Sequence, residues 1–218
     1  MIVKNFNITE LELTYFIGIN RIKINANVYT IDQLFELSDK IQNKYSDSIL
    51  QFFNENYILN TEHIFNACYF SLKAFHYKKS ISNKKELELL LYLATKRQIK
   101  SAINDVGINN SNIQNGIVNY CIVSYVDNVS VINNAIKEAL NANEIKFTLT
   151  QENADKFKII KEHFEISDEQ IKIILNSYGI KKDVEFLLKH NIHSLYSALN
   201  ELICEKMALL SLEKIAID

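Results

Sequence analysis

Few residues of this chain combine a type and a spacing that could do chemistry. No Gly-x-Ser-x-Gly nucleophile motif occurs in the sequence. Glu86 and Glu88 lie two positions apart on a predicted helix, so they point to different faces and cannot form an acid–base pair from that segment alone. Neither common glycine-rich phosphate loop can form, because the glycines are isolated at Gly18, Gly107, Gly116 and Gly179. These patterns favour a protein that acts by binding, with an enzyme of scattered catalytic residues as an alternative.

Histidines and cysteines give no metal-binding pattern. Among five histidines, only His190 and His193 have the spacing of one helical turn, and no cysteine lies nearby to complete a zinc site. The odd number and wide spacing of Cys68, Cys121 and Cys204 argue against a disulfide framework and for three small buried side chains in a reducing compartment. We therefore expect no metal, no cofactor and no small-molecule substrate.

One segment carries a strong positive charge. Residues 73–100 contain eight cations and two carboxylates, a net charge of +6, which leaves −8 for the rest of a chain whose total is −2. Such a patch can hold phosphates on an otherwise acidic protein, and lysines that solvate the ends of a buried helix are an equal alternative. The cations are Lys73, Lys78, Lys79, Lys84, Lys85, Lys96, Arg97 and Lys100.

The predicted C-terminal helix, residues 194–212, is unusually rich in apolar side chains. One apolar stripe is enough to pack a helix on its domain, so the surplus predicts a partner surface. A helix folded entirely into the core is the alternative. The residues concerned are Leu195, Leu199, Leu202, Ile203, Met207, Leu209, Leu210 and Leu212.

The elements that would position these residues follow from periodicity and capping signals. We expect one domain over residues 1–218, of the α/β (α+β) class, with a central mixed sheet flanked by helices and a helical C-terminal part. Helix starts are predicted at Thr30, at Asn60 or Thr61, at Asn83 and at Ser167. The helix over 84–94 is apolar almost all round, so it should be buried against the sheet. Strands are predicted over residues 11–24, 49–59, 117–126 and 145–149.

No targeting or membrane segment is expected. The first residues, MIVKNFNITELEL, carry an acidic residue where a signal peptide needs an apolar run. The least polar stretch, residues 113–126, contains Gln114, Asn115 and Asn119 and is shorter than the roughly 20 apolar residues that span a bilayer. We therefore expect a cytoplasmic protein that does not contact a membrane.

The run NKKELELLLYLATKRQIKSAINDVGI, residues 83–108, resembles the most characteristic stretch of a family of KEOPS subunits, the PRPK-binding protein (TPRKB) family. The matching features are a glutamate followed by an apolar helix, a short polar turn, a Gln-Ile pair, a short helix and Gly-Ile. Residues 60–75, 117–126 and 204–214 resemble flanking elements of the same family, and we expect an archaeal member. Apparent loop or helix insertions lie near 109–116 and 177–193.

The resemblance implies a regulatory subunit that is not an enzyme. It implies binding and stimulation of the kinase-like ATPase subunit of KEOPS, a complex that installs threonylcarbamoyladenosine in tRNA. It also implies that the chain holds the tRNA acceptor end, for which we expect Lys96 and Arg97 with help from Lys73, Lys78, Lys79 and Lys84. The kinase contact is expected at Leu199, Leu202, Ile203 and Met207. A helical protein-interaction module without RNA binding remains the other alternative.

Overall fold

The structure is a computed structural model that describes residues 1–9, 12–26, 28–147, 149 and 151–212. Its strands are β1 (Ile2–Ile8), β2 (Leu13–Lys23), β3 (Ser48–Phe53), β4 (Ile117–Ser124) and β5 (Asn143–Glu144). Its helices are α1 (Ile31–Lys44), α2 (Thr61–His76), α3 (Lys85–Ala94), α4 (Ile99–Val106), α5 (Asn110–Asn115), α6 (Val129–Ala139), α7 (Ala154–His163), α8 (Asp168–Ser177), α9 (Val184–His190) and α10 (Ile192–Leu212).

The sheet has the strand order β1-β2-β4-β3, and the short β5 pairs with the end of β2. Each pairing among the described strands is antiparallel, which corrects the expectation of a mixed sheet. Gly116 ends α5 with a φ of +62° just before β4, and a Cβ there would lie 2.6 Å from the carbonyl oxygen of Ile24. Only glycine fits this left-handed, closely packed junction.

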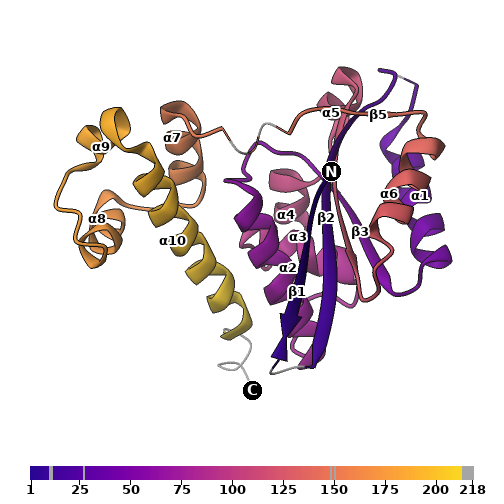
Figure 1. Cartoon of the computed structure of the whole chain (residues 1–218), viewed down its shortest axis with the longest axis horizontal. Coiled ribbons are helices and arrows are strands. Elements are labelled where there is room, and N and C mark those ends of the chain that lie inside the picture. Colours follow the sequence, from indigo (N-terminus) through magenta and orange to yellow (C-terminus); the bar gives the residue numbers. More distant parts are fainter. Residues whose placement is uncertain (10–11, 27, 148, 150, 213–218) are drawn as a thin grey trace.

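Helices cover both faces of the sheet (Figure 1). On one face α1 and α6 pack over a cluster that includes Leu34, Tyr120 and Ile132. On the other face α2, α3 and α4 enclose the larger core. The alternation along β4 divides its side chains between the two cores, as a strand buried on both faces requires. The α+β class with flanking helices is confirmed.

Helix α3 is buried, as its sequence predicts. Seven consecutive residues, Glu88 to Ala94, are buried, and α3 packs on β3, α2, α4 and α10. The helix begins one residue later than predicted. Its N-cap is Lys84, which makes no side-chain cap hydrogen bond, while Ser82 accepts a hydrogen bond from the Lys84 N–H over 3.1 Å. The predicted cap at Asn83 is therefore wrong.

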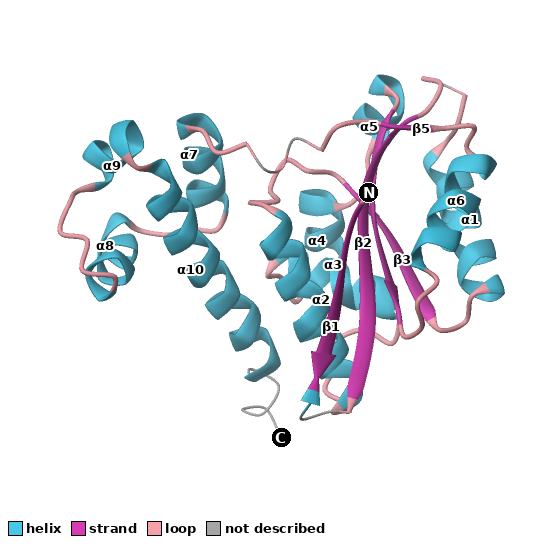
Figure 2. Ribbon diagram, viewed as in Figure 1, coloured by secondary structure: helices cyan, strands magenta, loops and turns pink. Residues whose placement is uncertain are grey.

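The C-terminal part is helical, and Figure 2 shows α7, α8 and α9 gathered around the N-terminal half of α10, beyond the central layers. Helix α10 contacts α2 and α3 as well as α7, α8 and α9. It therefore joins the central layers to the last helices. The part of the predicted closing element beyond residue 212 lies outside the described residues.

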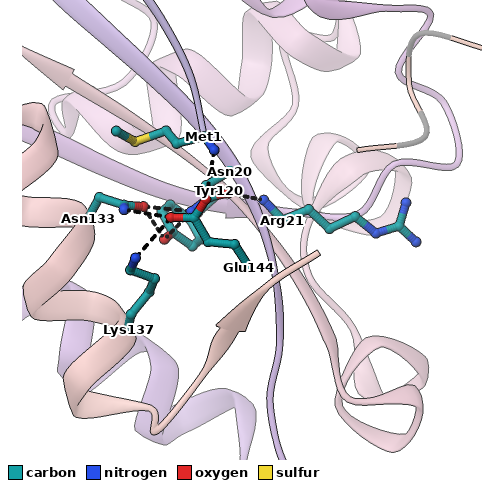
Figure 3. A network of polar contacts seen from close by, with 7 residues as sticks. All are labelled: Met1, Asn20, Arg21, Tyr120, Asn133, Lys137 and Glu144. Carbon is teal, nitrogen blue, oxygen red and sulfur yellow. Dashed lines mark hydrogen bonds and ion pairs between the residues drawn. The ribbon is translucent and has the colours of Figure 1, made fainter. Parts of the chain in front are cut away.

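A polar network ties α6 to the sheet (Figure 3). The Asn133 carboxamide oxygen accepts hydrogen bonds from Asn20 and from the Tyr120 hydroxyl, each over 2.7 Å. The Asn133 amide nitrogen donates to Glu144 over 3.1 Å. Glu144 also pairs with the Met1 amine at 2.8 Å and the Lys137 ammonium at 2.9 Å. The hydrogen bond from the Met1 amine and then that from Lys137 lower the pKa of Glu144 to about 2.

Other predicted boundaries compare with the structure as follows. The caps at Thr30, Asn60 and Ser167 are confirmed, each by a side-chain hydrogen bond to the first turn. Within the segment 11–24, one strand, β2, begins at Leu13, and Leu11 lies outside the described residues. One antiparallel neighbour of β2 is β1, which the strand pattern did not predict. The strand predicted over 49–59 ends at Phe53. The only described strand near 145–149 is β5, which ends at Glu144. Residues 109–116 hold α5, and 177–193 hold α9.

Candidate interaction surface

The predicted RNA-binding residues do not form one patch. Lys78, Lys79 and Lys84 are exposed near the start of α3, and Lys96 and Arg97 are half-buried beyond its end. A ten-residue helix is about 15 Å long, so it separates Lys84 at its start from Lys96 at its end. The structure therefore brings together only part of the predicted set.

Arg97 and Lys96 already have partners inside the chain. The Arg97 guanidinium donates a hydrogen bond of 2.8 Å to the carbonyl oxygen of Leu210. A cation at this place satisfies a free carbonyl at the C-terminal end of α10. The Lys96 ammonium lies 3.7 Å from the carboxylate of Asp105, whose same oxygen lies 3.6 Å from His163 Nε2. The predicted turn thus anchors α10 and α7, and its role in RNA binding stays a prediction.

The buried Glu88 carboxylate binds the backbone of the loop between α2 and α3. This carboxylate is fully buried and accepts hydrogen bonds from the backbone N–H groups of Ile81, at 2.9 and 3.0 Å to its two oxygens, and Ser82, at 2.7 Å. Such charge-assisted bonds are among the stronger hydrogen bonds in proteins. They fix the exposed loop that carries Lys78 and Lys79. Sequence reasoning placed Glu88 on the helix but missed this role, because its partners come from a loop without periodicity.

The four predicted kinase-contact residues of α10 lie in the protein core. Leu199 and Met207 are fully buried, Ile203 is 1% exposed and Leu202 is 5% exposed. The physical reason is that α10 packs against α2 and α3 and also against α7, α8 and α9. Its buried apolar side chains are used in contacts with these helices, so in this structure they are not available to a partner.

The apolar residues of α10 that do reach the surface lie at its C-terminal end. Leu209 is 46% exposed and Leu212 is 56% exposed. Next to them, a groove of about 430 Å³ separates the end of α10 from the end of α2. Its lining combines apolar and cationic groups: Phe70, Lys73, Ala74, Tyr77 and Lys79 from the α2 side, and Ala208, Ser211 and Leu212 from α10.

Contacts with neighbouring side chains fix several residues that line the groove. The Tyr92 hydroxyl and the Ser211 hydroxyl lie 2.7 Å apart and share a hydrogen bond, which fixes the end of α10 on α3. Phe70 stacks on Tyr92 with ring centroids 6.1 Å apart. Lys73 donates to the Tyr69 hydroxyl over 3.2 Å. An apolar floor with a cationic rim suits a partner segment that presents apolar and acidic side chains.

His63, Cys68 and Cys121 are buried in the core. His63 is fully buried, accepts from the Leu59 N–H at Nδ1 over 3.1 Å and lies 3.0 Å from the Leu93 carbonyl oxygen at Nε2. Burial lowers the pKa of His63 to about 4, so the ring is neutral at pH 7. The sulfurs of Cys68 and Cys121 lie 3.7 Å apart as free buried thiols. Within the described ranges, no group of three or more His, Cys, Asp or Glu residues could hold a metal.

The comparison with known families decides the wider assignment. The sequence profile described as kinase binding protein CGI-121 matches residues 27–211. The chain belongs to the CGI-121 family of kinase-binding proteins. The match runs from the loop before α1 almost to the end of α10, and it confirms the resemblance drawn from residues 83–108. No curated protein matches the chain. Among the described helices, none has the length and apolar character needed to cross a membrane.

Proposed function

We propose that this protein is a regulatory, non-catalytic subunit of the KEOPS tRNA-modifying complex in the cytoplasm. In this role it binds and stimulates the kinase-like ATPase subunit and recruits tRNA by its 3′ acceptor end. The observation that carries the proposal is the match of residues 27–211 to a kinase-binding family. Membership in that family makes a kinase the expected partner.

We place the kinase contact at the end of α10 and the adjoining groove. Leu209 and Leu212 expose apolar surface there, and Tyr77 exposes 49% of its area on the opposite side of the groove. Aromatic and aliphatic anchors of this kind supply most of the binding energy in protein interfaces.

The kinase contact is tested by isothermal titration calorimetry with the kinase-like subunit. Leu212→Glu places a charge in the proposed interface without touching the core, and we expect it to weaken binding by at least about ten-fold. Ile173→Glu is the matched control, because Ile173 is 67% exposed on α8, away from the groove. Equal affinities for wild type and Leu212→Glu would place the contact elsewhere.

The tRNA contact is proposed for the loop that carries Lys78 and Lys79, together with Lys73 and Lys84 beside it and with the turn at Lys96 and Arg97. Lys78 and Lys79 are exposed, and among the described residues neither forms an ion pair, so both can reach phosphates. The α4 N-cap Gln98 makes no side-chain cap hydrogen bond, which leaves first-turn N–H groups for a phosphate beside Arg97.

Fluorescence anisotropy with intact tRNA, and with tRNA lacking its 3′-terminal nucleotides, tests this contact. The double variant Lys78→Ala, Lys79→Ala should weaken binding and reduce the salt dependence by about one unit of slope for each lost phosphate contact. The control is Lys158→Ala, Lys172→Ala, which removes the same charge from the exposed faces of α7 and α8. If both doubles bind alike, or if the truncated tRNA binds as tightly as the intact one, the proposed RNA site is refuted.

A kinase-binding module without RNA binding is the second candidate. The observation that favours it is the separation of the cations into two groups, with Arg97 and Lys96 engaged inside the chain. It predicts that the chain binds the kinase-like subunit fully while the anisotropy titration shows no saturable tRNA binding at physiological salt.

A further inference from the structure

A second cavity, remote from the groove beside α10, lies where the ends of β2 and β4 meet α5. Its volume is about 150 Å³, and polar side chains dominate its lining: Arg21, Glu55, Asn56, Asn112, Asn115 and Asn119. A single water needs only about 10–15 Å³ of such space, so this cavity has room for a small organic ligand.

Asn119 is the unusual residue of this cavity. It sits on β4, opposite Arg21 of β2 and Phe53 of β3, and is fully buried. Neither its carboxamide oxygen nor its amide nitrogen has a hydrogen-bond partner among the described residues. Buried polar groups of native proteins are nearly always paired, so an amide with both atoms unpaired calls for a specific partner.

The asparagines of α5 and its N-cap that line the cavity have hydrogen-bond partners within the chain, and Asn56 is exposed to solvent. Asn109 and Asn112 cap α5 through reciprocal hydrogen bonds of 3.0 and 3.3 Å. The Asn115 amide donates to the Ser111 hydroxyl over 3.3 Å. The rim is therefore fixed by its own contacts, and Asn119 is the buried asparagine of this lining whose donor and acceptor are both unpaired among the described residues.

The chemistry of that amide selects a ligand edge with an acceptor beside a donor. An asparagine side chain pairs in this way with adenine, donating to N7 and accepting from the N6 amino group. The Arg21 guanidinium lines the same cavity, held at 2.9 Å from the Glu55 carboxylate, and its plane can stack on a flat base. We infer that this cavity binds the adenine base of a free nucleoside or nucleotide, with Asn119 reading its N6/N7 edge.

Thermal unfolding of the wild-type chain with adenosine tests the inference. At adenosine about ten-fold above its Kd, Tm should rise by roughly 3–6 °C. Inosine carries an oxygen in place of the N6 amino group, so it should bind about ten-fold more weakly. No adenosine-dependent shift, or equal shifts with inosine, would overturn the assignment.

The variant Asn119→Leu gives an independent readout. It replaces an unpaired buried amide by an apolar group of similar size, so the free variant should unfold at the same Tm as wild type or higher. Its Tm should no longer respond to adenosine. If adenosine raises the Tm of Asn119→Leu as much as that of wild type, the role of Asn119 is refuted. If Asn119→Leu does not fold, the comparison of adenosine with inosine on the wild-type chain still tests the inference.

A single-stranded oligoadenylate distinguishes the source of the base. Adenosine and adenosine monophosphate should each raise Tm when no oligonucleotide is present. If only the oligonucleotide bound, the free-ligand assignment would be wrong. Because the inference does not depend on kinase or tRNA binding, calorimetry with the kinase-like subunit separates its failure from that of the proposed function.

Discussion

Replacing Glu88 by Gln should destabilise the protein and loosen the basic loop. The carboxylate accepts backbone hydrogen bonds from Ile81 and Ser82 in a fully buried position. A glutamine keeps one accepting oxygen, and its amide group faces N–H donors that it cannot pair. A hydrogen bond to a charged group contributes about 1.5–3 kcal/mol. Because Glu88→Gln loses one such bond, it should lower the unfolding free energy by about that amount.

Urea unfolding followed by circular dichroism measures this change. The midpoint should fall with an unchanged m value, because the variant alters stability and not the surface exposed on unfolding. Glu86→Gln is the matched control, since Glu86 lies in the same helix turn and is only half-buried. A loss below about 0.5 kcal/mol for Glu88→Gln would refute the argument that this carboxylate holds the loop.

Three further predictions concern the core. Leu90→Ala should cost about 2–5 kcal/mol of unfolding free energy, and a loss below about one would contradict the burial of α3. Burial lowers the pKa of His63 to about 4, so its contribution to stability is complete above pH 6.5 and is lost as the pH falls toward 4. At pH 4.5 that loss should be about 2–3 kcal/mol relative to pH 7 in urea unfolding, and His63→Leu, less stable at pH 7, should remove this part of the pH dependence. Cys68 and Cys121 are buried and Cys204 is half-buried, so a thiol reagent should modify Cys204 in the native protein, and Cys68 and Cys121 only after unfolding; native modification of either would contradict their burial.

Local rules predicted the parts of the fold that depend on neighbouring residues. The capping boxes at Thr30 and Ser167 formed because a hydroxyl and an amide three residues apart satisfy each other's backbone groups. The burial of α3 followed from an apolar run that leaves no polar face. In these cases the information lies within four residues of the element concerned.

The sequence could not predict what depends on how distant layers meet. Leu202 and Met207 looked like surplus apolar residues, because the pattern shows one helix and not the several helices that pack against it. The basic segment looked continuous, since only the folded α3 separates Lys84 from Lys96. The unpaired amide of Asn119 is likewise a property of the cavity and not of any motif.

Hydrogen–deuterium exchange of the chain with and without the kinase-like ATPase subunit tests the central claim most directly. A bound partner slows exchange where it covers the surface and suppresses local opening. We predict slower exchange at the C-terminal end of α10 and in residues 70–79, with α8 and α9 unchanged. Unchanged exchange throughout the chain at saturating kinase, or protection confined to α8 and α9, would contradict the account.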